Sequence, residues 1–299
     1  MIIRKAERKK IKLRLGISGA PNSGKTRSAL EIARGIGGKI GLIDSEHGRG
    51  ELYAGMFDYD VIRLEAPFTP ESYINAILAF EREGYDVLII DSMSHAWNGK
   101  GGILEEVDQS KDKFTSGWKT ATPKQNALID TIMSSKMHII ATFRAKTEYV
   151  IEKNEYGKNQ PRKIGLAPIQ RPEIEYEFML FMTMNQDHFA QISKDNTRMF
   201  DENTLIQPNR EMGEKLLEWL NEGSDEPVVV KRDLLSIVEE INECVDLVSL
   251  ENVFKSLYTE FPDMRNQIIR SKDMKKEALI NGSIIQPNEI GHTYGGRLL

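Results

Sequence analysis

Residues 19–26 of the sequence read GAPNSGKT and match the pattern G-x-x-x-x-G-K-[ST] at every fixed position. An alternating apolar segment at 11–18 precedes them, and a segment whose apolar residues have helical spacing follows at 25–35. The two glycines permit backbone angles and a close approach to a ligand that a Cβ atom would prevent. Free N–H groups and the dipole of a helix N-terminus attract anions, so the stretch predicts a phosphate-binding loop.

This loop predicts roles for its chemically active residues. Lys25 is expected to reach the β- and γ-phosphates of a nucleoside triphosphate and to act in catalysis, and the Thr26 hydroxyl is expected to ligate Mg²⁺. The expected ligands are therefore ATP and Mg²⁺. The expected nucleotide-binding residues are Gly19, Ala20, Pro21, Asn22, Ser23, Gly24, Lys25, Thr26 and Arg27.

Two carboxylates follow segments that read as strands. Residues 87–90 form a continuous apolar run, typical of a strand covered on both faces, and Asp91 follows them. Beside a phosphate loop, Asp91 is expected to help hold Mg²⁺. Glu46 follows the expected strand at 39–44, and ligands gather at the carboxyl ends of strands in open α/β sheets. We therefore predict that Glu46 activates the water that attacks the γ-phosphate, the alternative being a solvated loop carboxylate.

The order of elements indicates the fold class. Further strands are expected at 60–64, 137–142, 175–184 and 189–193, and further helices at 71–83, 118–135 and 212–221. This alternation predicts an α/β three-layer sandwich with a mainly parallel central sheet. Residues 1–222 are expected to form this core, 223–232 a linker, 233–280 a small C-terminal helical domain, and 281–299 a flexible tail.

Composition excludes several classes of protein. The 299 residues are 40% hydrophobic and 28% charged, which excludes a disordered or fibrous chain. No apolar run is long enough to span a membrane, so no membrane partner is expected. Cys244 is the sole cysteine, which excludes an intrachain disulfide and favours the cytoplasm. The net charge of −5 means that nucleic-acid binding would need a local basic patch.

One such patch lies in residues 142–171. Cations exceed carboxylates there, tyrosines are interleaved, and the glycines and prolines argue against a regular core element. Cations for phosphates and rings for bases are what a groove for single-stranded DNA requires, although an ordinary charged surface loop would have similar composition. The expected DNA-binding residues are Arg144, Lys146, Tyr149, Lys153, Tyr156, Lys158, Arg162 and Lys163.

The chain resembles the RecA family of recombination ATPases over about residues 11–205. Residues 41–54, GLIDSEHGRGELYA, resemble the family's segment with the catalytic glutamate, and Asp91-Ser92 matches the end of its metal-binding strand. The chain is most similar to short RecA-like ATPases of bacteriophages, which assist single-strand annealing or strand exchange. The resemblance implies a RecA-like sandwich, catalysis by Glu46, and Mg²⁺ contacts at Thr26 and Asp91. It also implies single-stranded DNA as a partner, a homo-oligomeric ring or filament with ATP between subunits, and action in the cytoplasm of a bacterial host.

Residues 192–198 close the hairpin expected near the end of the core. Related RecA-fold ATPases place a lysine and an arginine here to reach the γ-phosphate of the neighbouring subunit, which implies catalytic roles in trans for Lys194 and Arg198. An exposed turn is the alternative. The chain departs from RecA at residues 142–144, where Thr-Phe-Arg stands in place of a segment that ends in glutamine.

Two function classes remain open, with a third less favoured. The leading hypothesis is an ATPase of phage recombination or annealing, stimulated by single-stranded DNA and by oligomerisation. The alternative is a DNA-independent RecA-fold ATPase switch that acts on a protein partner, such as a single-strand-binding protein or annealase, through the acidic helical appendage. A small-molecule kinase would need an acceptor pocket and an arginine-rich lid, and Glu46 suits water activation better.

Overall fold

The computed structural model of the chain describes residues 5–110, 116–153, 159–201, 205–224, 234–261 and 264–281. The chain divides into two compact units, Met1–Glu226 and Pro227–Leu299. This division falls inside the segment 223–232 that the sequence analysis expects to be a linker. The expected tail at 281–299 lies outside the described residues except for Asn281, which ends the last helix.

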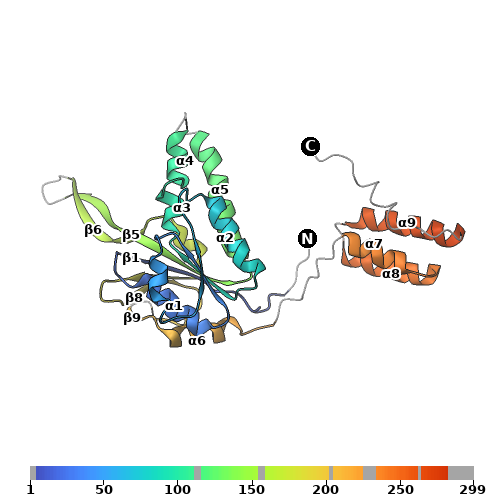
Figure 1. Ribbon diagram of the computed structural model, residues 1–299, viewed down its shortest axis with the longest axis horizontal. Helices are drawn as coiled ribbons and strands as arrows, with labels where there is room; N and C mark the ends of the chain where they lie inside the picture. The colour runs from blue at the N-terminus through green and yellow to red at the C-terminus, as the bar shows by residue number, and fades with distance from the viewer. Residues whose placement is uncertain are drawn as a thin grey trace. The chain divides into compact units, whose positions relative to one another are not determined.

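The first unit is built on one twisted sheet, with helices on both of its faces (Figure 1). Six neighbouring strands run parallel, and at one end of the sheet the next strand pairs antiparallel with the sixth and the last pairs antiparallel with it in turn. Their spatial order is β3 (Asp60–Arg63), β2 (Ile40–Asp44), β4 (Val87–Asp91), β5 (His138–Lys153), β1 (Arg14–Gly19), β7 (Leu180–Met184), β8 (Ala190–Asp195) and β9 (Leu205–Ile206). The predicted α/β sandwich with a mainly parallel sheet is therefore confirmed.

Two helical layers cover this sheet. On one face lie α1 (Lys25–Ile36) and α6 (Arg210–Leu220), and on the other lie α2 (Pro70–Arg82) and α5 (Ser116–Ser134). Two short helices, α3 (Ser94–Asn98) and α4 (Ile103–Gln109), join the layer of α2 and α5.

Successive residues of the central strands point into opposite layers, as the period of a strand requires. In β2, Leu42 packs against α1 and Ile43 against α2, and in β4 Ile89 and Ile90 divide in the same way. All four side chains are fully buried, and each such burial contributes roughly 1.5–3 kcal/mol. The continuous apolar run at 87–90 follows from this two-sided burial.

Helices α1 and α6 approach each other unusually closely because glycines face each other at their crossing. A Cβ atom on Gly35 of α1 would lie 2.0 Å from the Arg210 carbonyl oxygen of α6, and one on Gly213 would lie 2.2 Å from the Ile32 carbonyl oxygen. This contact brings the N-terminus of α6, which Asn209 caps through a 2.9 Å hydrogen bond from the Met212 N–H, towards the helix that follows the phosphate loop.

The segment between the fifth and seventh strands departs from the loop expected at 142–171. Strand β5 continues past the sheet and pairs antiparallel with β6 (Asn159–Pro168), from Ala145 opposite Pro168 to Lys153 opposite Asn159. The two form a hairpin that projects away from the sheet (Figure 1). Prolines are compatible with it because a two-stranded ribbon has free edges that need no N–H donor.

A second departure concerns the strand expected at 175–184, which begins only at Leu180. Residues 174–177 instead form a short 3-10 turn, η2 (Ile174–Glu177). Ile174 and Phe178 are four residues apart and both enter the same hydrophobic cluster. Hydrogen bonds between residues three apart, from the Tyr176 N–H to the Glu173 carbonyl oxygen and from the Phe178 N–H to the Glu175 carbonyl oxygen, form this turn and keep the segment out of the sheet.

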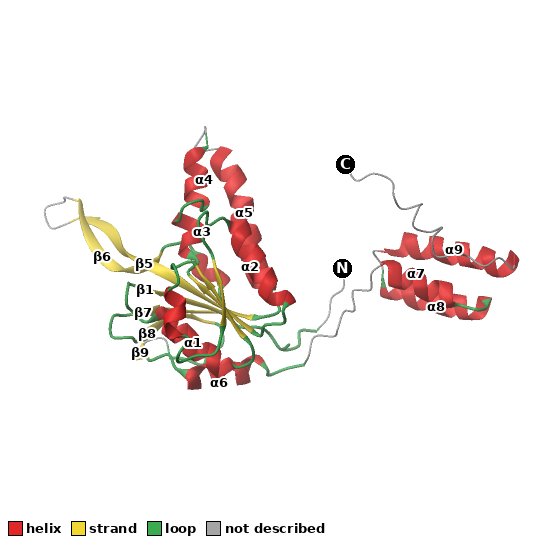
Figure 2. Cartoon of the chain, in the orientation of Figure 1, coloured by secondary structure: helices red, strands yellow, loops and turns green. Residues whose placement is uncertain are grey.

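The second unit is helical in its described part (Figure 2). It contains α7 (Leu234–Glu243), α8 (Leu247–Glu260) and α9 (Arg265–Asn281). Ile237, Ile241, Leu250, Leu257 and Ile268 form a hydrophobic cluster of its own. Within the described ranges of the whole chain, no helix has the length and apolar character needed to cross a membrane.

Acidification is expected to weaken the first unit through His138, at the start of β5. The His138 ring is buried, and its Nδ1 accepts a 3.1 Å hydrogen bond from the Leu13 N–H. Burial, aided by the charges of Lys12 and Arg14, lowers the pKa of His138 from 6.5 to about 4. Between pH 6.5 and 4, His138 therefore binds a proton in the unfolded chain but stays neutral in the folded chain. Stability should fall from pH 6.5 towards pH 4, by at most about 3 kcal/mol from this group.

His138→Asn isolates this effect because an asparagine Oδ1 can accept the same N–H without titrating. Urea unfolding followed by tryptophan fluorescence reports the first unit, since Trp97, Trp118 and Trp219 all lie within it. Between pH 6.5 and 4 the variant should lose less stability than the wild type. Equal losses would show that another group is responsible.

Candidate nucleotide site

The phosphate loop lies at the carboxyl end of β1 and leads directly into α1. Gly24 has φ +88°, in the left-handed region that favours glycine, and stands at the N-cap position of α1 without a side-chain cap. The first N–H groups of a helix have no partner within the helix. The loop and the first turn of α1 therefore present donors and a positive dipole end to an anion, as residues 19–26 predict. The buried Ser23 hydroxyl has no hydrogen-bond partner among the described residues, so the loop also holds an unused polar group.

Lys25 lies across this loop. Its Nζ donates hydrogen bonds to the carbonyl oxygens of Gly19, at 3.0 Å, and Ala20, at 2.9 Å. Burial lowers the pKa of Lys25, while the carboxylates of Asp91 and Glu46 oppose that shift. A half-buried ammonium bound by these two carbonyl oxygens can exchange them for phosphate oxygens, which are stronger acceptors.

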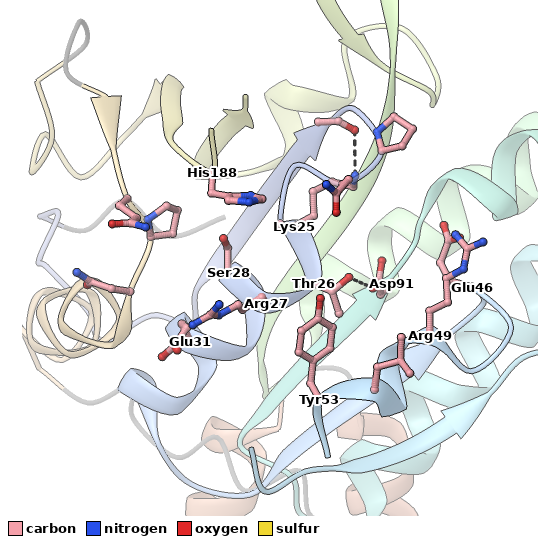
Figure 3. A pocket seen from close by; sticks show the side chains of 18 of the residues that line it. Lys25, Thr26, Arg27, Ser28, Glu31, Glu46, Arg49, Tyr53, Asp91 and His188 are labelled. Carbon is pink, nitrogen blue, oxygen red and sulfur yellow. Dashed lines mark hydrogen bonds between the residues drawn. The ribbon is translucent and has the colours of Figure 1, made fainter. Parts of the chain in front are cut away.

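Two threonines hold the buried Asp91 carboxylate at the end of β4. The Thr26 hydroxyl donates to Asp91 Oδ2 at 2.6 Å, and the Thr142 hydroxyl from β5 donates to Oδ1 at 2.5 Å. Burial raises the pKa of Asp91, and these two hydrogen bonds counteract it. The pair predicted to share a metal, Thr26 and Asp91, is therefore in direct contact (Figure 3).

These donors suit Mg²⁺. Both are oxygen atoms, and Mg²⁺ is usually held by one or two protein ligands together with phosphate oxygens and water. The described residues contain no cluster of three or more His, Cys, Asp or Glu side chains that would form a cage for a different kind of metal site. Thr26 and Asp91 would hold the ion, which would neutralise phosphate charge when bound.

Glu46 lies just after β2, and its carboxylate is clamped by Arg144 of β5. Arg144 Nε donates to Glu46 Oε1 at 2.8 Å, and Nη2 donates to Oε2 at 2.5 Å, which makes a bidentate ion pair. The Ser92 hydroxyl adds a 3.1 Å hydrogen bond to Oε1. Burial favours a higher pKa for Glu46, but the hydrogen bonds and charge of Arg144 outweigh it and lower the pKa below its usual value.

Parallel register explains why these residues meet. Asp44 lies opposite Asp91, and Gly19 lies opposite Arg144, so the phosphate loop, Glu46, Asp91 and Arg144 follow the same edge of the sheet. Ligands gather at that edge in open α/β sheets. Around them is a cavity of about 1310 Å³ that also touches η1 (Arg49–Tyr53) and the N-terminal end of α6.

Arg144 is placed differently from the sequence prediction, which grouped it with the DNA contacts. Its guanidinium lines the nucleotide cavity and is bound by Glu46. Lys146 is exposed in β5, one position past the point where the strand leaves the sheet. Tyr149, Lys153, Arg162 and Lys163 lie on the paired strands of the hairpin, and Tyr156 and Lys158 lie outside the described residues.

Lys194 and Arg198 are in different situations. Lys194 Nζ donates to the Tyr176 carbonyl oxygen at 2.6 Å and to that of Glu175 at 3.4 Å, so its own chain already binds it. Arg198 is exposed, has φ +58°, and has no hydrogen bond or ion pair within the described part of the chain. Neither is among the described residues that line the cavity.

His188 is a cavity residue that the sequence analysis did not identify. It lies in the turn between β7 and β8, and a Cβ atom on Gly24 would be 2.9 Å from its Nδ1 (Figure 3). No motif in the sequence contains His188. The available signal was the gap between the strands expected at 175–184 and 189–193, because a turn there follows β7, the strand next to β1.

A protein-family model described as an AAA domain matches residues 11–207, which span the sheet, the phosphate loop and both carboxylates. A search of curated proteins finds no match.

Proposed function

The chain belongs to the AAA domain family, a family of P-loop ATPases, and we propose that it hydrolyses ATP to ADP and phosphate at the site around residues 19–26. One observation carries this proposal. Lys25, the Thr26–Asp91 pair and Glu46 line one cavity, although they come from three different strand ends. A phosphate-binding loop beside a separate carboxylate that can activate water suits transfer of a phosphoryl group to water.

In the proposed reaction the loop N–H groups and Lys25 bind the phosphates and stabilise the charge that develops on them. Glu46 accepts a proton from water while the water oxygen bonds to the γ-phosphorus and the bond from that phosphorus to the ADP oxygen breaks. Bound Mg²⁺, held by Thr26 and Asp91, supplies further charge neutralisation.

The finer part of the proposal is a RecA-like ATPase that acts on single-stranded DNA in phage recombination or annealing. The projecting hairpin of β5 and β6 supports it, because the sequence of its described strands includes several cations and Tyr149 and because it begins at the edge of the nucleotide cavity. Side chains along such a ribbon can contact a strand of nucleic acid, the cations at its phosphates and the aromatic ring at its bases. The resemblance of residues 41–54 to the RecA segment supports the same assignment.

Assembly into a ring or filament belongs to this proposal. Arg198, which is exposed and makes no ion pair with the residues that the structure describes, suits a group that reaches the nucleotide of a neighbouring copy better than Lys194 does, because Lys194 is bound by two carbonyl oxygens of its own chain. An arginine supplied in trans would make hydrolysis depend on assembly.

The test is ATP hydrolysis by the full chain with and without oligo-dT, at low and at raised salt. We expect oligo-dT to raise turnover, and the increase to shrink as salt rises, because phosphate contacts weaken with ionic strength. Fluorescence anisotropy of a labelled oligonucleotide measures binding in parallel. Hydrolysis that ignores oligo-dT, together with no binding, would reject the role in DNA while leaving the ATPase assignment intact.

The second unit favours an alternative, an ATPase switch that acts on a protein partner. Acidic side chains outnumber basic ones in residues 224–299, which disfavours DNA as the ligand of this unit. A single-strand-binding protein or an annealase is the partner that we would test first. Under this alternative, deletion of residues 227–299 abolishes partner binding but leaves the turnover without a partner unchanged.

A further inference from the structure

A buried histidine that has no part in the proposed reaction is hydrogen-bonded to the residue that precedes Glu46. His95 lies in the short helix α3 and is 6% exposed. Its Nδ1 is 2.8 Å from the hydroxyl oxygen of Ser45, which is fully buried. The ring also stacks on Phe68, with the ring centroids 4.9 Å apart and the ring planes at 21° to each other. These two contacts together fix the orientation of the imidazole.

The Ser45 hydroxyl has one hydrogen to donate, and three acceptors lie near it. Nδ1 of His95 is the nearest at 2.8 Å, whereas the carbonyl oxygens of Asp91 and Ser92 are at 3.3 and 3.2 Å, beyond the usual length of an O–H···O bond. Burial and the charge of Arg144 lower the pKa of His95, so the ring is neutral at neutral pH and its Nδ1 can accept. The Ser45 hydroxyl therefore donates to His95.

Ser45 is connected to Glu46 in two ways. Along the chain it directly precedes Glu46, and its N–H donates to the Asp91 carbonyl oxygen at 2.8 Å. Through its side chain, the hydroxyl oxygen accepts from the Ser92 N–H at 2.9 Å, and the Ser92 hydroxyl in turn donates to Glu46 Oε1 at 3.1 Å. Ser45 therefore holds both the backbone that carries Glu46 and a residue that binds its carboxylate.

The loss of an acceptor at position 95 would act on Glu46 through these contacts. The Ser45 hydroxyl would turn to one of the two carbonyl oxygens, so the fold would keep a partner for it, but Ser45 and Ser92 would shift. A general base must stay within hydrogen-bond reach of its water, and a misplacement of about 1 Å can cost roughly a hundredfold in rate. A smaller displacement of Glu46 should cost roughly tenfold.

We propose that His95 is a positioning residue for the hydrolytic step and holds Glu46 in place for its water through the Ser45 hydroxyl. This role rests on the proposed function and adds a residue that is not among the described residues lining the cavity. His95 acts on the carboxylate and not on the phosphate-binding loop. Its contribution is therefore to the rate of the chemical step and not to the affinity for ATP.

The test compares His95→Leu, His95→Asn and Ser45→Ala with the wild-type chain. Leucine keeps an apolar side chain against Phe68 but offers no acceptor, whereas the side-chain oxygen of asparagine can take the place of Nδ1. His138→Asn, which replaces a buried histidine at the edge of the sheet opposite to the cavity, is the matched control. Turnover is measured over a range of ATP concentrations, ATP affinity by displacement of a fluorescent nucleotide, and folding by urea unfolding.

We expect His95→Leu and Ser45→Ala each to lower turnover at saturating ATP by roughly tenfold and to leave the affinity for ATP unchanged. His95→Asn should recover most of the turnover. The double variant should be no slower than the slower single variant, because both changes remove the same hydrogen bond. In the Glu46→Gln background, His95→Leu should change turnover little, since the carboxylate that it positions is absent.

Normal turnover in a folded His95→Leu protein, with slow turnover in Glu46→Gln, would overturn the positioning role and leave the proposed function intact. A loss of ATP affinity as large as the loss of turnover would also overturn it, because it would show that the whole cavity is disturbed. Equal losses in His95→Leu and His95→Asn would reject the hydrogen bond to Ser45 as the cause.

Two further outcomes are decisive. If His95→Leu does not fold, Ser45→Ala decides, and normal turnover in that variant would overturn the proposal. Normal turnover in Glu46→Gln would instead reject Glu46 as the base, which removes this step of the proposed function and the positioning role with it.

Discussion

Lys25→Ala is expected to lower ATP turnover by at least about a hundredfold, the order found when a group that stabilises developing charge is removed. The Lys25 ammonium lies on the carbonyl oxygens of Gly19 and Ala20, inside the loop that would surround the phosphates. Without Lys25, the negative charges of Asp91 and Glu46 are no longer balanced by this ammonium of α1 and would repel the phosphates. ATP should therefore bind more weakly as well as react more slowly.

The measurement is turnover over a range of ATP concentrations, together with displacement of a fluorescent nucleotide. Lys119→Ala removes an exposed lysine from α5 and serves as the control. Tryptophan fluorescence under urea checks that Lys25→Ala remains folded, since the truncation leaves a gap only at a half-buried position. Unchanged hydrolysis in a folded Lys25→Ala protein would place the active site elsewhere.

Much of the first unit could be predicted because its sequence signals are local. The loop at 19–26 requires a strand before it and a helix after it, and β1 and α1 provide them. Residues 87–90 are apolar without interruption because α1 covers one face of β4 and α2 the other. Patterns of this kind depend on residues close together in the sequence, so they predict a strand or a helix without knowledge of the whole fold.

The hairpin was not predicted because its residues were interpreted as a charged loop. Its prolines and glycines read as a loop, yet a free ribbon outside the sheet accommodates them. The 3-10 turn at 174–177 was missed for a related reason. Residues Ile174 and Phe178, four apart, would also share one face of a strand, so their pattern does not distinguish a strand from the turn that the hydrogen bonds show.

The Arg144–Glu46 contact joins residues that are far apart in sequence, so no motif contains both. What brings them together is the order of strands, with β4 between β2 and β5 and with all three carboxyl ends at one edge. Sequence analysis placed Glu46 at that edge but assigned Arg144 to the segment that follows it. A residue at the end of a strand can belong to the sheet or to the segment that follows it, and the strand register shows that Arg144 belongs to the sheet.

Glu46→Gln is the second change with a large expected effect, a fall in turnover of roughly a hundred- to ten-thousandfold, the range that a general base contributes. Glutamine has the size of glutamate and retains an oxygen that can accept hydrogen bonds from Arg144 and Ser92. It cannot accept a proton from water at neutral pH. The substitution therefore removes proton transfer while leaving the surrounding contacts largely available.

Although turnover should fall in Glu46→Gln, the affinity for ATP should equal that of the wild type or exceed it. Glu46 is close enough to Lys25 for its charge to act on the ammonium, so the same negative charge opposes the phosphates that Lys25 attracts. Binding is measured by nucleotide displacement, and turnover by phosphate release. Glu83→Gln, at the exposed end of α2, controls for loss of a surface carboxylate.

The combination of the two measurements is what makes Glu46→Gln decisive. Weak binding with slow turnover would indicate that the substitution disturbs the cavity as a whole, since Lys25→Ala is expected to give the same pattern. Tight binding with slow turnover isolates a defect in the chemical step and assigns the proton to Glu46. Tight binding with normal turnover would move the base to another group, and the ion pair with Arg144 would then be a structural contact between β2 and β5.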